Sequence, residues 1–421
     1  MRRLIPFLFT ILIGLSACTP ADESKYSCAK VDGTNQFRCS AVLTGLGATM
    51  GGQDISVSFI AYVPKKSAFD PYVELVRTET TRLNHLFDKY TGYDGLNNVK
   101  TINDKAGIEA VTVDQALIDL LLLSREWTTL SQGTFDVSLG AVLEVWKSYR
   151  DDGRDNNENG QPGSVPTVDE LTDAAQYTGW SFVEIDNVAN TVYLTHERAS
   201  LDLGGISKGY TTDLVSIELR KAGLTNFLLS FGGSSSVIQG EKPDGKNWIV
   251  GVRAPIRGNP WVELDKAYFQ TDFSLSSSGD DQNYYYADNE VYYHHLIDPK
   301  TNFPADHGVR SVTVFINDDA AIAEALSKAL YILPLDEAYA FVEAYNTQHP
   351  DAKLAAIWIV DNDRLPVGDY PQKTFTQGIS NGTSIEAPFT PHLHAQPQRK
   401  NQRVLKKASS KPSLFRSCLS V

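Results

Sequence analysis

Cysteine and methionine are scarce in this chain, which has four cysteines and two methionines among 421 residues. The cysteines form no Cys-x-x-Cys pair and no Cys/His pattern, so the sequence contains no zinc-binding motif. Basic residues are also in short supply, with 38 Lys and Arg against 51 Asp and Glu. The resulting net charge of -13 argues against a general nucleic-acid-binding protein, and no nucleic acid is expected among its partners.

The apolar stretch at the N-terminus is too short for a stable membrane span. Residues 4–15 follow Arg2 and Arg3, and the stretch ends in Leu-Ser-Ala-Cys, with Cys18 as its last residue. This is the pattern of a bacterial lipoprotein signal peptide covering residues 1–17. It predicts an exported protein that is anchored through a lipid on Cys18, on the periplasmic or outer-surface side of a bacterial membrane. The alternative is an ordinary signal peptide with a coincidental cysteine.

Polar segments flank the central part of the chain. Residues 18–40 have the composition of a tether, and Cys28 and Cys39 within it predict a disulfide, because exported segments favour one. From Pro388 to the end there are seven basic residues and no acidic one, which predicts a basic, disordered tail over 371–421. Either contact with anionic lipid headgroups or simple solvation would suit such a tail.

Hydrophobic periodicity between these segments predicts both strands and helices, in a mixed α/β order without a regular βαβ repeat. Thr112 and Gln115 fit the N-cap and third helical positions of a capping box, so a helix is expected to start there. Residues 150–166 are polar and acidic and are expected to form a solvated loop. The other expected helices cover 71–88, 320–332 and 336–345, and the expected strands include 55–63, 311–316 and 354–360.

The segment 200–210, Ser-Leu-Asp-Leu-Gly-Gly-Ile-Ser-Lys-Gly-Tyr, follows a β-prone run and leads into a helical pattern. Asp202, Gly205 and Lys208 therefore fall at a strand-to-helix turn. Glycines allow backbone N–H groups to approach an anion, and a helix N-terminus and a lysine both attract one. The turn is a candidate phosphate cradle, and the alternative is a tight turn with a local salt bridge.

Further short motifs accompany this turn in a fixed order. They lie at 49–51, 133–140, 229–234, 243–248, 276–280 and 294–301. In this order and spacing, the set resembles the ApbE family of FAD:protein FMN transferases. The resemblance covers roughly residues 41–370.

This resemblance implies a two-lobed α+β fold with a mixed or antiparallel sheet and an FAD-binding cleft between the lobes. It also implies that FMN is transferred from FAD to a Thr or Ser hydroxyl of a partner protein, with release of AMP. The positions that match FAD contacts of the family are Met50, Tyr90, Thr134, Phe135, Asp136, Asp202, Lys208, Leu296 and Ile297.

His295 matches the histidine of the family motif and is the candidate proton acceptor, because an imidazole titrates near neutral pH. Its neighbour His294 and the Tyr-Tyr-Tyr run at 284–286 keep a packing role open for it. Packing is equally open for Tyr90, because an aromatic residue at a helix end is commonly half-buried.

The motif for binding Mg²⁺ is altered. The family has Ala-Asp-x-x-x-Thr, and its Asp and Thr bind the metal together with backbone near the position of Gly205. Here Glu324 and Lys328 stand at those places, one helical turn apart. Three interpretations remain open: Glu324 and backbone hold Mg²⁺ while Lys328 swings away, Lys328 replaces the metal, or the two form an exposed ion pair.

Two other functions therefore accompany transfer as alternatives. One is a non-catalytic lipoprotein that binds or delivers FAD, and the other is hydrolysis of the FAD pyrophosphate. The altered pair favours the first of these more than any other feature of the sequence does.

Overall fold

The computed structural model describes residues 26–47, 49–50, 53–259, 262–287, 291–350, 353–361 and 364, and three short strands further on. Cys18 and the predicted signal peptide lie outside the described residues. No helix in the described part of the chain has the length and apolar character needed to cross a membrane.

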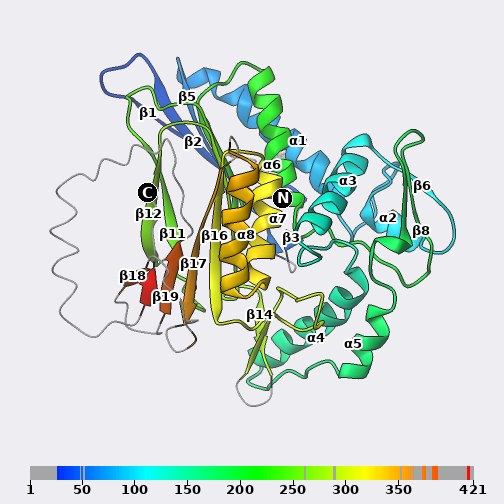
Figure 1. Ribbon diagram of the computed structural model, residues 1–421. Helices are drawn as coiled ribbons and strands as arrows, with labels where there is room; N and C mark the ends of the chain where they lie inside the picture. The colour runs from blue at the N-terminus through cyan, green and yellow to red at the C-terminus, as the bar shows by residue number, and fades with distance from the viewer. Residues whose placement is uncertain are drawn as a thin grey trace, which may run out of the picture.

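An eleven-stranded sheet forms the centre of the molecule (Figure 1). All of its pairings are antiparallel except that of β19 with β20. In spatial order the strands are β1 (Ser27–Lys30), β2 (Phe37–Leu43), β5 (Val57–Val63), β9 (Phe227–Phe231), β10 (Ser235–Gln239), β13 (Phe273–Gly279), β16 (Val309–Ile316), β17 (Leu354–Asp361), β19 (Gly382–Glu386), β18 (Gln372–Phe375) and β20 (Phe415–Ser417).

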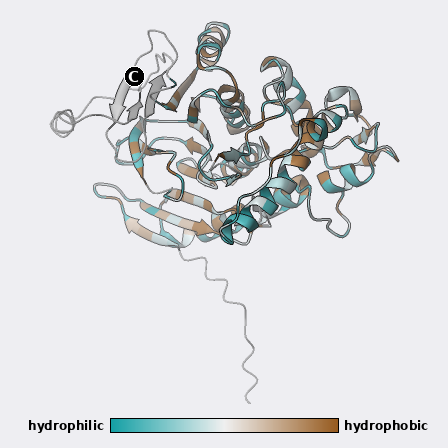
Figure 2. Ribbon diagram, turned by 90° about the horizontal axis from the view of Figure 1, so that it is seen from below, coloured by the Kyte–Doolittle hydropathy of each residue, from teal (hydrophilic) through white to brown (hydrophobic). Residues whose placement is uncertain are grey.

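Helices cover one face of this sheet, and Figure 1 shows two of them, α7 and α8, side by side against it. The helices on this face are α1 (Asp70–Phe87), α6 (Ser207–Lys221), α7 (Ala320–Ile332) and α8 (Leu335–Gln348). The strands are rich in hydrophobic residues and the helices mix both kinds (Figure 2), as expected for helices with one buried side. Because α7 packs on the sheet and also contacts α6 and α8, nearly all of its residues are buried.

A hairpin of β11 (Trp248–Arg253) and β12 (Glu263–Phe269) packs on the opposite face. Side chains alternate along a strand, so Val314 of β16 belongs to the core under the helices while Phe315 faces the hairpin. Phe269 of the hairpin lies 5.5 Å, centroid to centroid, from the Phe315 ring. The sheet is thus buried on both faces here.

A second group of elements lies beside the sheet and forms the other lobe (Figure 1). It contains α2 (Val99–Asp104), α3 (Gln115–Leu130), α4 (Gly140–Glu158), α5 (Val168–Ala175), a sheet of β6 (Val111–Thr112), β8 (Thr191–Leu194) and β7 (Val183–Asp186), and a hairpin of β14 (Tyr284–Tyr286) and β15 (Tyr292–His294). Short elements complete the chain: β3 (Thr49–Met50), β4 (Gln53–Asp54) and 3-10 turns at Lys66–Ala68 and Trp180–Phe182. The architecture is the α+β fold that the family resemblance implied.

Helices α6 and α7 cap each other. The Asp213 carboxylate of α6 accepts hydrogen bonds from the first two backbone N–H groups of α7, each at 2.8 Å. In return, Glu324 of α7 accepts the N–H of Gly209, in the first turn of α6, at 2.6 Å. Helix N-termini leave such N–H groups without partners in their own helix. A Cβ on Gly209 would lie 2.3 Å from the Ala320 carbonyl oxygen, so only glycine permits this approach.

Three local predictions need correction. Thr112 ends β6, and the N-cap of α3 is Asp114, whose side chain accepts from Ala116 N. The polar segment after Arg150 is not a loop throughout, because α4 continues to Glu158. Strands β18, β19 and β20 lie within 371–421, where the sequence predicted only a disordered tail.

The predicted cysteine pair is joined in the structure. Cys28 of β1 lies directly opposite Cys39 of β2, and a disulfide connects them. The second half of the segment 18–40 is therefore not a tether, since β1 and the start of β2 belong to the main sheet.

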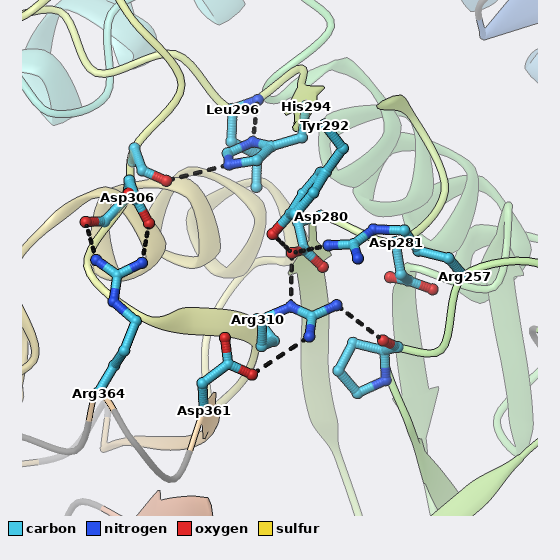
Figure 3. Close-up of polar contacts among 12 residues, drawn as sticks. Arg257, Asp280, Asp281, Tyr292, His294, Leu296, Asp306, Arg310, Asp361 and Arg364 are labelled. Atoms are coloured by element: carbon cyan, nitrogen blue, oxygen red, sulfur yellow. Dashed lines mark hydrogen bonds and ion pairs between the residues drawn. The ribbon is translucent and has the colours of Figure 1, made fainter. Parts of the chain in front are cut away.

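Asp280 follows β13 and ties the β14–β15 hairpin to the sheet (Figure 3). Its buried carboxylate accepts from Arg310 Nε of β16 at 2.6 Å, from the Tyr292 hydroxyl at 2.6 Å and from Arg257 at 2.9 Å. Arg310 also reaches Asp361 at 3.3 Å. This cluster fixes the strand that ends at His294, next to the candidate proton acceptor.

We expect Asp280→Asn to lower the free energy of unfolding by about 3 kcal/mol, because two arginines would lose the charge that compensates their burial. Urea denaturation measures this. Asp173→Asn is the matched control, since Asp173 pairs with Arg198 at the surface, with side chains 53% and 44% exposed, and should cost much less stability than Asp280→Asn. Equal costs for the two variants would contradict the assigned role of Asp280.

Candidate active site

A cleft of about 690 Å³ lies between the sheet and the second lobe. Strands β5, β9, β10, β13 and β16 form one wall, and α4 with the segments around 134–137 and 202–205 forms the other. Of the predicted site residues, those that line it are Tyr90, Thr134, Phe135, Asp136, Asp202, Gly205, Lys208, His295, Leu296, Ile297 and Lys328. The structure thus brings together residues from widely separated motifs. Met50 lies in β3, and its side chain is outside the described residues.

The turn before α6 forms as the sequence predicted, and Asp202 and Lys208 both reach the cleft. They do not pair with each other. Asp202 accepts the N–H of Gly204 at 2.8 Å and faces Lys89 Nζ at 2.9 Å. Burial raises the pKa of the Asp202 carboxyl, but the charge and hydrogen bond of Lys89 outweigh this, so the pKa is lowered overall.

Lys89 is a site residue that the sequence analysis missed. Its ammonium lies between Asp202 and Glu144, which is 3.2 Å away, and 5.1 Å from the ring centre of Tyr90. Lys147 of α4 approaches the same ring at 5.3 Å. Tyr90 is therefore a half-exposed aromatic ring between two cations at the cleft rim. The only signal for Lys89 in the sequence was its position next to Tyr90.

Lys208 pairs with Glu324, far away in sequence. Its Nζ lies 2.5 Å from Glu324 Oε1, and Lys328 Nζ lies 3.0 Å from the same oxygen. Glu324 is fully buried, whereas the Lys328 side chain is 14% exposed and lines the cleft. The pair Glu324–Lys328 is therefore not an exposed surface ion pair, which rules out one of the three interpretations.

Burial alone would raise the pKa of Glu324, but the two lysines lower it to about 2. Burial lowers the pKa of Lys328 to about 8, against the attraction of Glu324 and with added repulsion from Lys208. The three groups carry one net positive charge toward the cleft.

The residues present do not fit the magnesium site that the family resemblance implied. Both carboxylate oxygens of Glu324 are taken, Oε1 by the lysines and Oε2 by the Gly209 N–H. The hydroxyl of Ser327, one residue before Lys328, is bonded to Ser278 Oγ at 2.8 Å. Within the described part of the chain, no three His, Cys, Asp or Glu side chains are grouped to hold a metal ion. Mg²⁺ needs several oxygen ligands in near-octahedral order.

The two adjacent histidines have different environments. His294 is buried, with Nε2 3.1 Å from the Ala305 carbonyl oxygen and Nδ1 accepting the Leu296 N–H, so it holds the loop together (Figure 3). His295 lines the cleft, and its buried Nδ1 has no hydrogen-bond partner among the described residues. Burial lowers its pKa well below 6.5, and the charges of Arg150, Lys328 and Lys208 lower it further. The imidazole is therefore neutral at pH 7.

Leu296 and Ile297 are buried in the cleft wall. The Leu296 N–H is bonded to His294 and its carbonyl oxygen accepts from Ala305 N at 3.0 Å. Both backbone groups of Leu296 are thus used within the loop, and its contribution to a ligand is through the side chain.

The segment Thr134–Asp136 is held by its own turn. Thr134 Oγ1 donates to the Ser131 carbonyl at 2.7 Å, and the Phe135 N–H donates to Ser131 Oγ at 3.1 Å. Asp136 accepts from Ser138 N and Oγ at 2.8 and 2.6 Å. Burial raises the pKa of Asp136, although these hydrogen bonds oppose the shift.

Arg150 and Arg253 also line the cleft and were missed as site residues. Arg150 lies on α4, at helical spacing from Leu143 and Lys147, which line the same wall. This helical spacing can be seen in the sequence. It was missed because residues 150–166 were expected to form a loop. Arg253 pairs with Asp281 at 2.7 Å. Six cationic side chains from five segments therefore line the cleft, against four carboxylates, and this excess of positive charge suits an anionic ligand.

The sequence pattern of the ApbE family matches residues 52–352. A protein of Vibrio cholerae named FAD:protein FMN transferase is 26% identical over 299 residues, which is 71% of this chain and 83% of that protein. One of the same name from Treponema pallidum is 28% identical over 282 residues, covering 63% and 74% of the two chains. The ApbE protein of Thermotoga maritima superposes with a TM-score of 0.60 and 27% identity, over 76% of this chain and 94% of that one. The family pattern spans more than half of the chain, so the protein belongs to the ApbE family.

Proposed function

We propose that the protein transfers FMN from FAD to a Thr or Ser hydroxyl of an exported or membrane partner protein, releasing AMP. The observation that carries this proposal is the cleft itself, which is lined by the neutral imidazole of His295 and by Lys208 and Lys328. Family membership and the transferase names of the relatives support it. Those names favour neither a non-catalytic carrier of FAD nor a hydrolase.

The step is a displacement at the phosphorus of the FMN half of FAD. The acceptor oxygen forms a bond to this phosphorus, the bond to the bridging oxygen breaks, and AMP leaves with that oxygen and its electron pair. The hydroxyl proton passes to His295. Such transfers depend mainly on positioning and on positive charge beside the phosphates.

The cationic residues of this chain supply that charge. Lys208 stands at the N-terminus of α6, where the helix dipole adds partial positive charge. Lys328 lies beside it across Glu324. Tyr90, Phe135, Leu296 and Ile297 offer aromatic and apolar surface for the ring systems of FAD.

Magnesium is not part of this proposal, because the oxygens of Glu324 and Ser327 are engaged within the protein. FAD enters as the substrate, and the acceptor is a separate protein.

We also propose that the protein is exported and anchored to a bacterial membrane through lipid on Cys18. The support is the Leu-Ser-Ala-Cys sequence after an apolar stretch, together with the disulfide between Cys28 and Cys39, which oxidising compartments favour. When the protein is expressed in a bacterial host, Cys18→Ser should move it from the membrane fraction to the soluble fraction. Membrane association that survives this substitution would contradict the anchor.

We expect a mass gain of one FMN, as a phosphodiester, on an acceptor protein known to be flavinylated by a relative, after incubation with FAD and this protein. Intact-mass spectrometry of the acceptor measures the gain, and chromatography of the nucleotides should show an equal amount of AMP. AMP formed equally without the acceptor would indicate hydrolysis instead. FAD that binds but stays intact would indicate a carrier.

His295→Ala should lower the transfer rate by about 10²- to 10⁴-fold, the usual contribution of a general base. In the wild type, kcat/KM for FAD should stay level down to pH 6.5 and fall only below it. A protonated His295 cannot accept the hydroxyl proton. Because its pKa is lowered, this loss of activity occurs at more acidic pH. The groups that produce the shift are His294, Arg150 of α4, Lys208 of α6 and Lys328 of α7.

His349→Ala is the matched control, since His349 is an exposed residue stacked on Tyr345 at the end of α8. It should leave both the rate and the pH profile unchanged. A wild-type profile that already falls on going from pH 7.5 to 6.5 would contradict the assignment of His295.

A further inference from the structure

The place where the family resemblance implied a divalent cation is taken by a side chain of this chain. Lys328 stands on α7, one helical turn after Glu324, and its ammonium lies 3.0 Å from Glu324 Oε1. A cation bound to that oxygen would have to displace Lys328, and Lys208 holds the same oxygen at 2.5 Å. Each oxygen of the Glu324 carboxylate therefore already has a partner within the protein, and Oε1 has two.

Among the described residues, the hydroxyl groups that could serve as replacement ligands near Lys328 already have partners. The hydroxyl of Ser327 is bonded to Ser278 Oγ at 2.8 Å and to the Glu324 carbonyl oxygen at 2.8 Å. Ser277 Oγ is bonded to Thr313 Oγ1 at 2.9 Å. Each of these hydroxyl groups is thus engaged within the protein.

The charges beside the cleft also disfavour a divalent cation. Lys208 and Lys328 together carry two positive charges against the single negative charge of Glu324, so one positive charge remains beside the cleft. This charge repels a divalent cation and attracts a pyrophosphate. Lys328 has three N–H donors, and Glu324 is the partner of one of them. The remaining donors are available for phosphate oxygens, in the way that open coordination positions of a metal would be.

We propose that the Lys328 ammonium, held by Glu324 beside Lys208, takes the place of the divalent cation at the FAD pyrophosphate. Binding of FAD and transfer of FMN then require no divalent metal. This inference rests on the proposed function, because it concerns the charge that stabilises the departing AMP in the same cleft. Lys328 is in this sense a catalytic residue that contacts the substrate phosphates.

The first test compares the purified protein in EDTA and in excess Mg²⁺. The dissociation constant of FAD, from flavin fluorescence, and the rate of FMN transfer, from intact mass of the acceptor, should be the same in both. Titration calorimetry with Mg²⁺ alone should show no binding to the free protein.

The second test removes the charge. Lys328→Met keeps the length of the side chain, and Glu324 retains Lys208 and the Gly209 N–H, so the fold should persist with an unchanged circular dichroism spectrum. We expect FAD to bind about 10- to 100-fold more weakly, with a larger loss of transfer, in EDTA and in Mg²⁺ alike. Lys328→Arg, which keeps the charge, should recover part of the binding.

The matched control is Lys100→Met, which removes a lysine from another i, i+4 pair, with Asp104 on α2 at the surface. It should change neither the binding of FAD nor the transfer. The double variant Glu324→Asp with Lys328→Thr should acquire a dependence on Mg²⁺ that the wild type lacks.

Two results would separate this inference from the proposed function. Transfer that EDTA abolishes and Mg²⁺ restores would overturn the role of Lys328 while leaving the transferase intact. Metal-independent binding of FAD that is weakened by Lys328→Met, without transfer to any acceptor, would support the role of Lys328 and overturn the transferase.

Discussion

The buried carboxylate of Glu324 is the interaction on which the active cleft depends. A charge without solvent must be compensated, and here three partners do so: two lysines and the backbone N–H of Gly209. Those partners come from α6 and α7. The same ion pair that neutralises Glu324 therefore also sets the distance between the helices and aims both lysines at the cleft.

The reciprocal capping of α6 and α7 explains why this arrangement is rigid. Asp213 of α6 caps α7, and Glu324 of α7 serves the first turn of α6, so neither helix can shift without exposing N–H groups of the other. Gly209 permits the close approach. A site for phosphate chemistry benefits from such rigidity, because charges aimed in advance need no reorganisation when the transition state forms.

The accumulation of positive charge in the cleft has a cost in the free protein. Lys208, Lys328 and Arg150 repel one another, and their charges add to the effect of burial, which lowers the pKa of His295 well below 6.5. A bound pyrophosphate would relieve this repulsion and make His295 a stronger base. Substrate binding and proton acceptance are thus coupled through one electrostatic field. The Asp280 cluster keeps the hairpin before His295 in place by a separate set of ion pairs.

The local hydrophobic pattern of the sequence determined many of the helices and strands. The amphipathic and apolar runs specify α7 at 320–332 and the strand at 354–360, because helix and strand periodicities depend only on neighbours in sequence. The Asp-Leu-Gly-Gly turn before α6 and the cysteine pair at 28 and 39 were also readable from spacing and composition. The α4 helix was hidden, since its C-terminal half is polar on most sides and resembles a loop.

Tertiary structure alone decided which charges meet. Lys208 and Glu324 are 116 residues apart, and nothing local indicates that they share a hydrogen bond. Likewise, Lys89 meets Asp202, and Arg150 turns into the cleft, only because α1, α4 and the turn before α6 converge at one end of the sheet. The sequence by itself determined the elements, the motifs and the altered Glu324–Lys328 pair. Packing of α7 against α6 and the sheet decided that this pair is buried, joined to Lys208 and directed at the cleft, because burial and distance depend on residues far apart in the chain.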